Sequence, residues 1–154
     1  MYYSLTFDSN GVQKNTWADW GLIPDTPPMI PPPKPNYTFV DIPGRPGGPL
    51  DLTGIPFGRL TYKRIQDSWN FLREPTNRRT RVELYEELEQ FFIGKVVTVK
   101  MEEDLNHYYK GRFEVSKPKT GIGPIQFTIS FDLEPVRYNV VDDSIDTTFA
   151  PETI

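Results

Sequence analysis

The segment 125–133 alternates strictly between apolar and polar side chains, and this pattern constrains the fold more than any other feature of the sequence. Its apolar members are Ile125, Phe127, Ile129, Phe131 and Leu133. The residues between them are Gln126, Thr128, Ser130 and Asp132. Successive side chains of a strand point to opposite faces, so the pattern predicts a strand with one buried and one solvated face. Pro135 ends it, because proline cannot donate to the ladder.

Two further strands are predicted before it, at 95–101 and 108–116, and the third strand spans 124–133. Alternation places Val97, Val99 and Met101 on one face of the first, and Tyr109, Phe113 and Val115 on one face of the second. The turn between them contains Glu102, Glu103, Asp104, Asn106 and His107. These oxygen ligands could bind calcium, but the spaced carboxylates and central glycine of a dedicated calcium loop are missing. A plain acidic turn without a metal is the favoured interpretation.

One helix is well marked. Thr80 and Glu83 match the capping box, in which a hydroxyl and a carboxylate each satisfy a free backbone N–H. Apolar residues then recur at helical spacing: Leu84, Tyr85, Leu88, Phe91 and Phe92. Gly94 follows as the usual left-handed residue beyond the last turn. The glutamates of the other face indicate a solvated surface rather than acid chemistry, so the helix is predicted to cover a sheet.

Prolines and glycines dominate the stretch from Pro24 to Pro56. The part at 23–35 can be neither helix nor central strand, and it favours polyproline II. It is either an extended connector or a docking strip for an aromatic groove of another protein. Strands are then predicted at 36–42, 59–63 and 68–73, with a glycine-containing loop at 45–49.

These elements predict an α+β domain that is mainly antiparallel β. The expected sheet resembles a sandwich or split barrel, with one amphipathic helix packed on it and extended proline-rich loops. A chain of 154 residues is long enough to bury a core, and without cysteine its stability depends on packing alone.

Composition also excludes several functions. A net charge of −4 argues against binding of nucleic acid through phosphate neutralisation. No apolar run long enough to span a membrane is present, and the first residues do not resemble a leader, which predicts a chain made in the cytosol. His107 is the only histidine and lies in a predicted turn, so neither catalysis nor a cofactor is expected.

Three tryptophans suggest where contacts lie. Trp69 falls in a predicted strand and is expected in the core. Trp17 and Trp20 flank Asp19 near a loop, where large aromatic residues often anchor protein interfaces. Stacking of these two rings on sugar is an alternative, which would make the chain a carbohydrate-binding accessory module.

The order of several short motifs resembles the N-terminal domain of the distal tail proteins of long-tailed bacteriophages, from Tyr3 to about Tyr138. The matching pieces include an opening strand at 3–7, the segments 15–24, 37–44 and 48–53, Gly94-Lys95-Val96, 108–112, and Asp132-Leu133-Glu134-Pro135. None of these motifs is specific alone, but their shared order covers most of the chain.

The resemblance implies a structural virion protein at the tail tip. Such proteins form a hexameric ring that joins the tail tube protein to tail-tip or baseplate hub proteins, around the channel for genome ejection. The implied partners are further copies of the chain, those two neighbours and the tape measure protein, without sequence-specific nucleic acid or a membrane. The candidate interface residues are Trp17, Asp19, Trp20, Asp41, Pro43, Gly44, Tyr108 and Tyr109.

The domain boundaries predicted on this basis are a ring-forming domain at 1–138 and an acidic arm at 139–154 that becomes ordered on a neighbour. Many members of the family carry a second, galectin-like domain, and the short remainder predicts its absence here. Two alternatives to the ring protein stay open, which are the carbohydrate-binding module and an adaptor that uses the proline motif.

Overall fold

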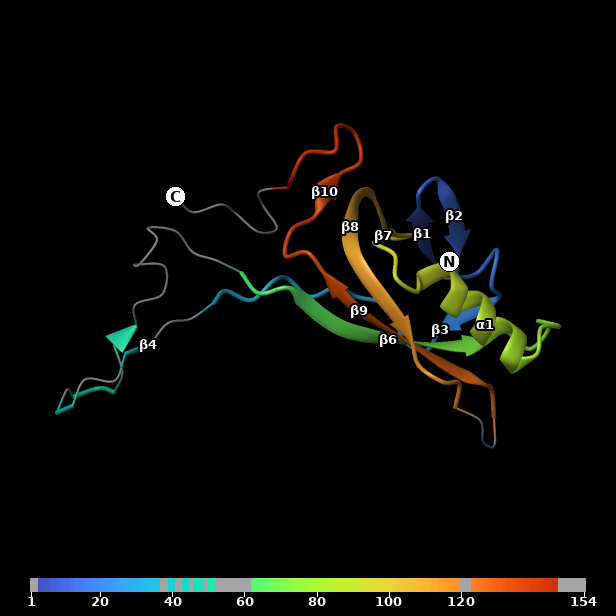
Figure 1. Cartoon of the computed structure of the whole chain (residues 1–154), viewed down its shortest axis with the longest axis horizontal. Helices are drawn as coiled ribbons and strands as arrows, with labels where there is room; N and C mark the ends of the chain where they lie inside the picture. The colour runs from blue at the N-terminus through green and yellow to red at the C-terminus, as the bar shows by residue number, and fades with distance from the viewer. Residues whose placement is uncertain are drawn as a thin grey trace.

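The computed structural model describes residues 3–36, 39–40, 43–44, 46–48, 50–51, 62–119 and 123–146. Its elements in chain order are β1 (Leu5–Ser9), β2 (Val12–Asn15), β3 (Leu22–Pro24), β4 (Phe39–Val40), β5 (Leu50–Asp51), β6 (Ile65–Arg73), α1 (Arg81–Phe92), β7 (Val97–Met101), β8 (Asp104–Val115), β9 (Gln126–Leu133) and β10 (Tyr138–Asn139). The predicted class is confirmed, since the fold is mainly antiparallel β with one helix (Figure 1).

One antiparallel sheet organises the domain. Its strand order is β2-β1-β7-β8-β9-β6-β3, and β10 adds to β8 outside this path. The pair β4–β5 forms a separate small sheet, and β4 lies away from the main sheet in Figure 1.

The strand predicted from alternation is β9, and it lies in the middle of the sheet between β8 and β6. Its four inward residues, Phe127, Ile129, Phe131 and Leu133, are at most 3% exposed. Gly111 on β8 faces Leu133, and a Cβ added there would lie 2.2 Å from the backbone oxygen of Asp132. A glycine at this position therefore allows β8 and β9 to approach closely.

The acidic turn is shorter than predicted, because β8 begins at Asp104 instead of Tyr108. Only Glu102 and Glu103 form the turn, and Asp104 pairs with Met101. The polar residues that follow Asp104 belong to β8 because β10 pairs with this part of the strand, and His107 lies opposite Asn139. That partner lies far along the chain, so local residue preferences could not indicate it.

Helix α1 covers the inner face of the sheet, as predicted. The hydroxyl of Thr80 accepts a hydrogen bond from the N–H of Glu83 at 3.1 Å, which is one half of the expected capping box. Gly94 follows the helix with a φ of +67°. The ring of Phe92 meets Phe7 at 4.9 Å and Phe113 at 5.4 Å between centroids, so helix and sheet share one aromatic core.

The proline-rich segment packs on the main sheet of the same chain, as an extended strip beside β6. The indole N–H of Trp69 donates to the carbonyl of Met29 at 3.0 Å, and Ile30 is only 6% exposed. Pro35 forms an isolated bridge with Tyr62. Prolines suit this position at a sheet edge because they do not offer a ladder donor to another chain.

The remaining predictions hold in part. Of the strand expected at 36–42, residues 36, 39 and 40 are described, and Phe39–Val40 form β4. Of the strand expected at 59–63, residues 62–63 are described, and they form no named strand. The strand expected at 68–73 is longer, since β6 begins at Ile65. The short strands β2, β3, β5 and β10 were not predicted.

Candidate interaction surfaces

Residues 15–21 form a compact turn that is built by Asn15 and Asp19. The side-chain oxygen of Asn15 accepts hydrogen bonds from the N–H groups of Trp17 and Ala18, both at 2.9 Å. The Asp19 carboxylate accepts from the N–H of Asn15 at 2.7 Å. Asp19, a predicted interface residue, therefore has a structural role in this turn, because its carboxylate replaces a backbone acceptor.

Trp20 does not lie at the surface, contrary to the prediction. Its side chain is fully buried, with ring centroids 5.5 Å from Phe91, 5.6 Å from Phe92 and 5.8 Å from Phe7. The turn directs the indole under helix α1, where it completes the aromatic core. It cannot offer its ring to a partner protein or a sugar in this fold.

Trp17 is half-buried beside an open hollow of about 380 Å³. The polar side chains around this hollow connect the turn to the segment before α1. The amide of Asn77 donates to the carbonyl of Trp20 at 2.9 Å, and the guanidinium of Arg79 donates to the carbonyl of Asp19 at 2.6 Å. These hydrogen bonds hold the two loops together. Of the two tryptophans predicted to form an interface, Trp17 alone remains near the surface, because Trp20 is buried.

Pro43 and Gly44 are exposed beside the small sheet. Gly44 has a φ of +78°, and a Cβ there would meet nothing within 4 Å, so a glycine is needed for its backbone conformation rather than for close packing. Asp41 lies outside the described residues. An interface role for this segment stays a prediction.

Tyr108 and Tyr109 point to opposite faces of β8. Tyr109 is 3% exposed and belongs to the core, so it cannot serve as an exposed contact. Tyr108 stacks on Tyr138, with centroids 5.2 Å apart, and its hydroxyl donates to Asp143 at 2.8 Å. Burial and this hydrogen bond raise the pKa of Tyr108 to about 12. The hydrogen bond to Glu134, followed by burial, likewise raises the pKa of Tyr138 to about 12.

A cluster of charged side chains joins the end of the described chain to β8. The carboxylate of Asp146 lies 2.6 Å from Nε of Arg137 and 3.2 Å from Nε2 of His107. The other ring nitrogen of His107 lies 3.0 Å from Asp104. Burial lowers the pKa of Arg137, but hydrogen bonds to Asp146 and Tyr109 raise it more.

This cluster changes the interpretation of the C-terminal segment. Residues 139–146 were predicted to belong to an arm that becomes ordered on a neighbour, whereas they pack on β8 of the same chain. The boundary predicted after Tyr138 falls inside β10. Residues 147–154 lie outside the described part.

The outward face of the sheet is polar along β6, β8 and β9, as the alternation predicted. Its members include Gln66, Ser68, Asn70, Arg112, Glu114, Thr128, Ser130 and Asp132. Thr128 donates to the side-chain oxygen of Asn70 at 2.8 Å, and Arg64 pairs with Asp132 at 2.7 Å. Cross-strand pairs of this kind stabilise a solvated sheet face.

Two of the three acids at 102–104 have partners within the protein. Glu102 accepts hydrogen bonds from the N–H and the hydroxyl of Ser4, and Asp104 pairs with His107. In the described residues, no group of three or more His, Cys, Asp or Glu side chains could hold a metal ion. Nor does that part of the chain contain a helix with the length and apolar character needed to cross a membrane.

Comparison with known proteins gives a likeness in structure alone, since no protein-family model and no curated protein matches the sequence. The chain is similar to the crystal structure of the SPP1 Dit (gp 19.1) protein, described as a paradigm of the hub adsorption apparatus in phages that infect Gram-positive bacteria. The TM-score is 0.58 at 14% sequence identity. The likeness covers 88% of this chain and 52% of that one, so this chain spans about half its length.

Proposed function

We propose that this chain is a structural protein of a bacteriophage tail, located at the tail tip of the virion. In this proposal it forms a homohexameric ring that joins the tail tube to the tail-tip or baseplate hub and surrounds the DNA channel. The observation that carries the proposal is the fold shared with SPP1 Dit over 88% of the chain. The ordered motifs from Tyr3 to about Tyr138 support the same role independently of the fold.

The polar outward face of β6, β8 and β9 suits the wall of such a channel. Small uncharged side chains such as Ser68, Thr128 and Ser130 dominate its centre. Acidic residues accompany the basic ones on this face: Arg64 at its edge pairs with Asp132 at 2.7 Å, and Arg112 lies opposite Asp132 in the strand register, two positions from Glu114. Passing DNA is retained where clustered basic residues neutralise its phosphates, so a face that mixes the two charges in this way favours passage. The net charge of −4 acts in the same direction.

The proposal gives this chain a role in assembly and none in catalysis. Both ring nitrogens of His107, the only histidine, face carboxylates of the same chain at 3.0 and 3.2 Å. A histidine held in this way is a poor general base, because its nitrogens are already engaged. The proposed partners are further copies of the chain, the tube protein, the hub protein and the tape measure protein.

The two alternative functions receive less support. A sugar platform built from Trp17 and Trp20 would need both rings at the surface, and Trp20 is fully buried. A proline-motif adaptor would need a free proline-rich strip. Here the indole N–H of Trp69 donates to the carbonyl of Met29 in the strip, and the side chain of Ile30, also in the strip, is buried.

The native mass of the purified chain, measured across concentration and salt, tests the ring. We expect a species near six times 17.8 kDa, seen by electron microscopy as a ring with a central opening. A DNA mobility-shift assay on the same sample should show no retention at physiological salt. A strict monomer that also fails to bind purified tube protein would overturn the proposal, and sugar binding by that monomer would favour the accessory module.

A further inference from the structure

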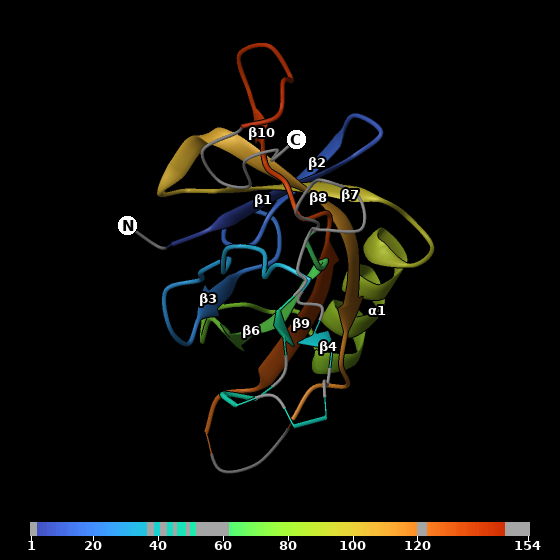
Figure 2. The ribbon, with the colours of Figure 1, turned by 90° about the vertical axis from the view of Figure 1, so that its left-hand side faces the viewer.

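Two carboxylates and two basic side chains form a closed network where the end of the described chain packs on β8. Asp146, which follows β10, lies 2.6 Å from Nε of Arg137 and 3.2 Å from Nε2 of His107. Asp104, the first residue of β8, lies 3.0 Å from Nδ1 of His107 and 3.8 Å from Arg137. These four residues are called the ion network below. Figures 1 and 2 show β10 and the loop after it at the end of β8 that is remote from α1.

The geometry of the ion network fits a protonated His107. A carboxylate can only accept a hydrogen bond, and each ring nitrogen of His107 has a carboxylate oxygen at 3.0 or 3.2 Å. An imidazolium donates from both nitrogens and therefore satisfies both contacts. A neutral imidazole carries one proton, so its second nitrogen turns a lone pair toward a carboxylate.

The balance of charge leads to the same result. With His107 protonated, the ion network holds two positive and two negative charges. With His107 neutral, Arg137 alone faces the two carboxylates. The four side chains are between 11% and 27% exposed, and an unbalanced charge costs more at such positions than in water. Tyr109, on the same face of β8, hydrogen-bonds to Arg137, and burial raises its pKa, so its hydroxyl stays neutral and adds no charge.

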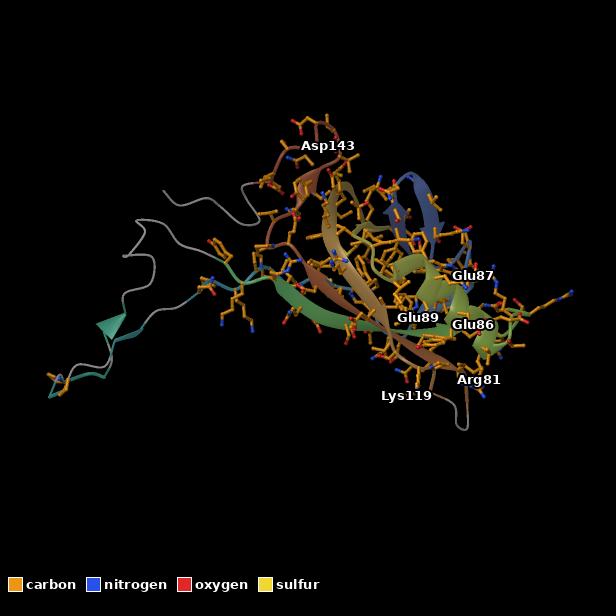
Figure 3. The ribbon with its side chains drawn as sticks, viewed as in Figure 1. Arg81, Glu86, Glu87, Glu89, Lys119 and Asp143 are labelled. Atoms are coloured by element: carbon orange, nitrogen blue, oxygen red, sulfur yellow. The ribbon has the colours of Figure 1, made fainter. Side chains whose placement is uncertain are left out.

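The other charged groups at this end of the sheet have partners of their own or face elsewhere. Lys100 and Lys110 alternate with buried residues of β7 and β8 and point to the opposite face of the sheet. Glu103 is exposed in the turn before β8. Glu102 accepts from Ser4, Glu134 from Tyr138, Asp142 from Ser144 and Asp143 from Tyr108. Figure 3 shows Asp143 well apart from the labelled glutamates of α1, so the acidic face of the helix does not reach this end.

We propose that His107 is a pH-sensitive latch that holds residues 139–146 on β8. The protonated ring binds Asp146 and Asp104 together, and loss of one ring proton leaves Arg137 alone to hold the segment. Histidine is the side chain that ordinarily changes charge between pH 5 and 8, and the chain contains one histidine and no cysteine. The stabilisation by the latch is therefore complete on the acidic side of this range and is lost as the pH rises through it.

Hydrogen exchange at two pH values tests the latch in the full natural chain. The N–H of Asn139 donates to the carbonyl of Ser144, and the N–H of Val140 donates to the carbonyl of Asn106. Their protection factors are measured at about pH 5.5 and about pH 8, each against an unstructured peptide at the same pH. We expect about tenfold less protection at the higher pH. This factor corresponds to about 1.4 kcal/mol, close to the lower limit for a hydrogen bond to a charged group. The amides of β9 are the internal control and should keep their protection.

Two variants separate the latch from a merely structural contact. His107→Gln has no titrating group at this position, so its protection should be low and equal at both pH values. Asp104→Asn replaces a group that only accepts by an amide that can donate to Nδ1 of His107. A neutral His107 then satisfies both of its contacts, so this variant should keep its protection at both pH values. A purely structural role would instead lower protection in both variants.

Equal protection at the two pH values in the natural chain would overturn the inference. A pH dependence that persists in His107→Gln would overturn it as well, because another group would then control the segment. All the contacts of the latch lie within one copy of the chain. A monomer that shows the latch would therefore count against the proposed ring and leave the latch in place.

Discussion

Replacing Asp146 by alanine should release the C-terminal segment from β8. The Asp146 side chain is 11% exposed, and its carboxylate contacts Arg137 at 2.6 Å and His107 at 3.2 Å. Loss of one partner from a fully buried ion pair costs about 3–5 kcal/mol, and loss from an exposed pair less than about 1 kcal/mol. Arg137 and His107 are 22% and 23% exposed, so the expected cost lies between these limits, at about 2 kcal/mol.

Hydrogen exchange measures this loss of free energy directly in the C-terminal segment. The N–H of Asn139 donates to Ser144, and the N–H of Val140 donates to Asn106. If the segment opens locally, a loss of about 2 kcal/mol should speed exchange of both amides about 30-fold. Glu103→Ala is the matched control, because it removes the same charge from an exposed position. Unchanged exchange in Asp146→Ala would show that the ion cluster does not hold the segment.

Three other predictions concern the sheet and its edges. Tyr108 has a pKa raised from 10.0 to about 12 in the folded chain, so its contribution to stability is complete below pH 10 and lost as pH rises towards 12. Tyr108→Phe should flatten that decline in thermal melts, and an equally steep curve would contradict this. Gly111→Ala would place a Cβ 2.2 Å from the Asp132 carbonyl oxygen, and we expect a loss of about 3 kcal/mol in urea unfolding, at the upper end for overpacking. Trp69→Phe removes the 3.0 Å hydrogen bond to Met29 and should cost about 1 kcal/mol, with faster proteolysis of the proline-rich strip. Proteolysis at the natural rate would show that the strip is held by packing alone.

Sequence patterns predicted the elements that depend mainly on neighbouring residues in the chain. The alternation in 125–133 identified β9 and its buried face, and the helix could be located from Thr80 to Gly94. Each of these signals concerns residues a few positions apart, within one element. The polar outward face of the sheet followed from the same alternation, so this candidate surface was also accessible from the sequence.

The surfaces that depend on distant residues were not predicted. Trp17 and Trp20 lie three positions apart in one turn and looked equivalent, yet the turn sends one ring into the core. The cluster of His107 and Asp146 joins residues 39 positions apart, and it became visible only when β10 was seen beside β8. No local preference indicates such pairs.

The sequence by itself determined where β9 and the helix form, because side-chain periodicity and capping residues act over a few positions. It also set the balance of charge and the absence of cysteine, on which the excluded functions depend. Only the tertiary structure decided which aromatic residues are buried and where residues 139–146 pack. These features arise from strand pairing between remote segments, whose free energy depends on the whole sheet rather than on any one stretch of the chain.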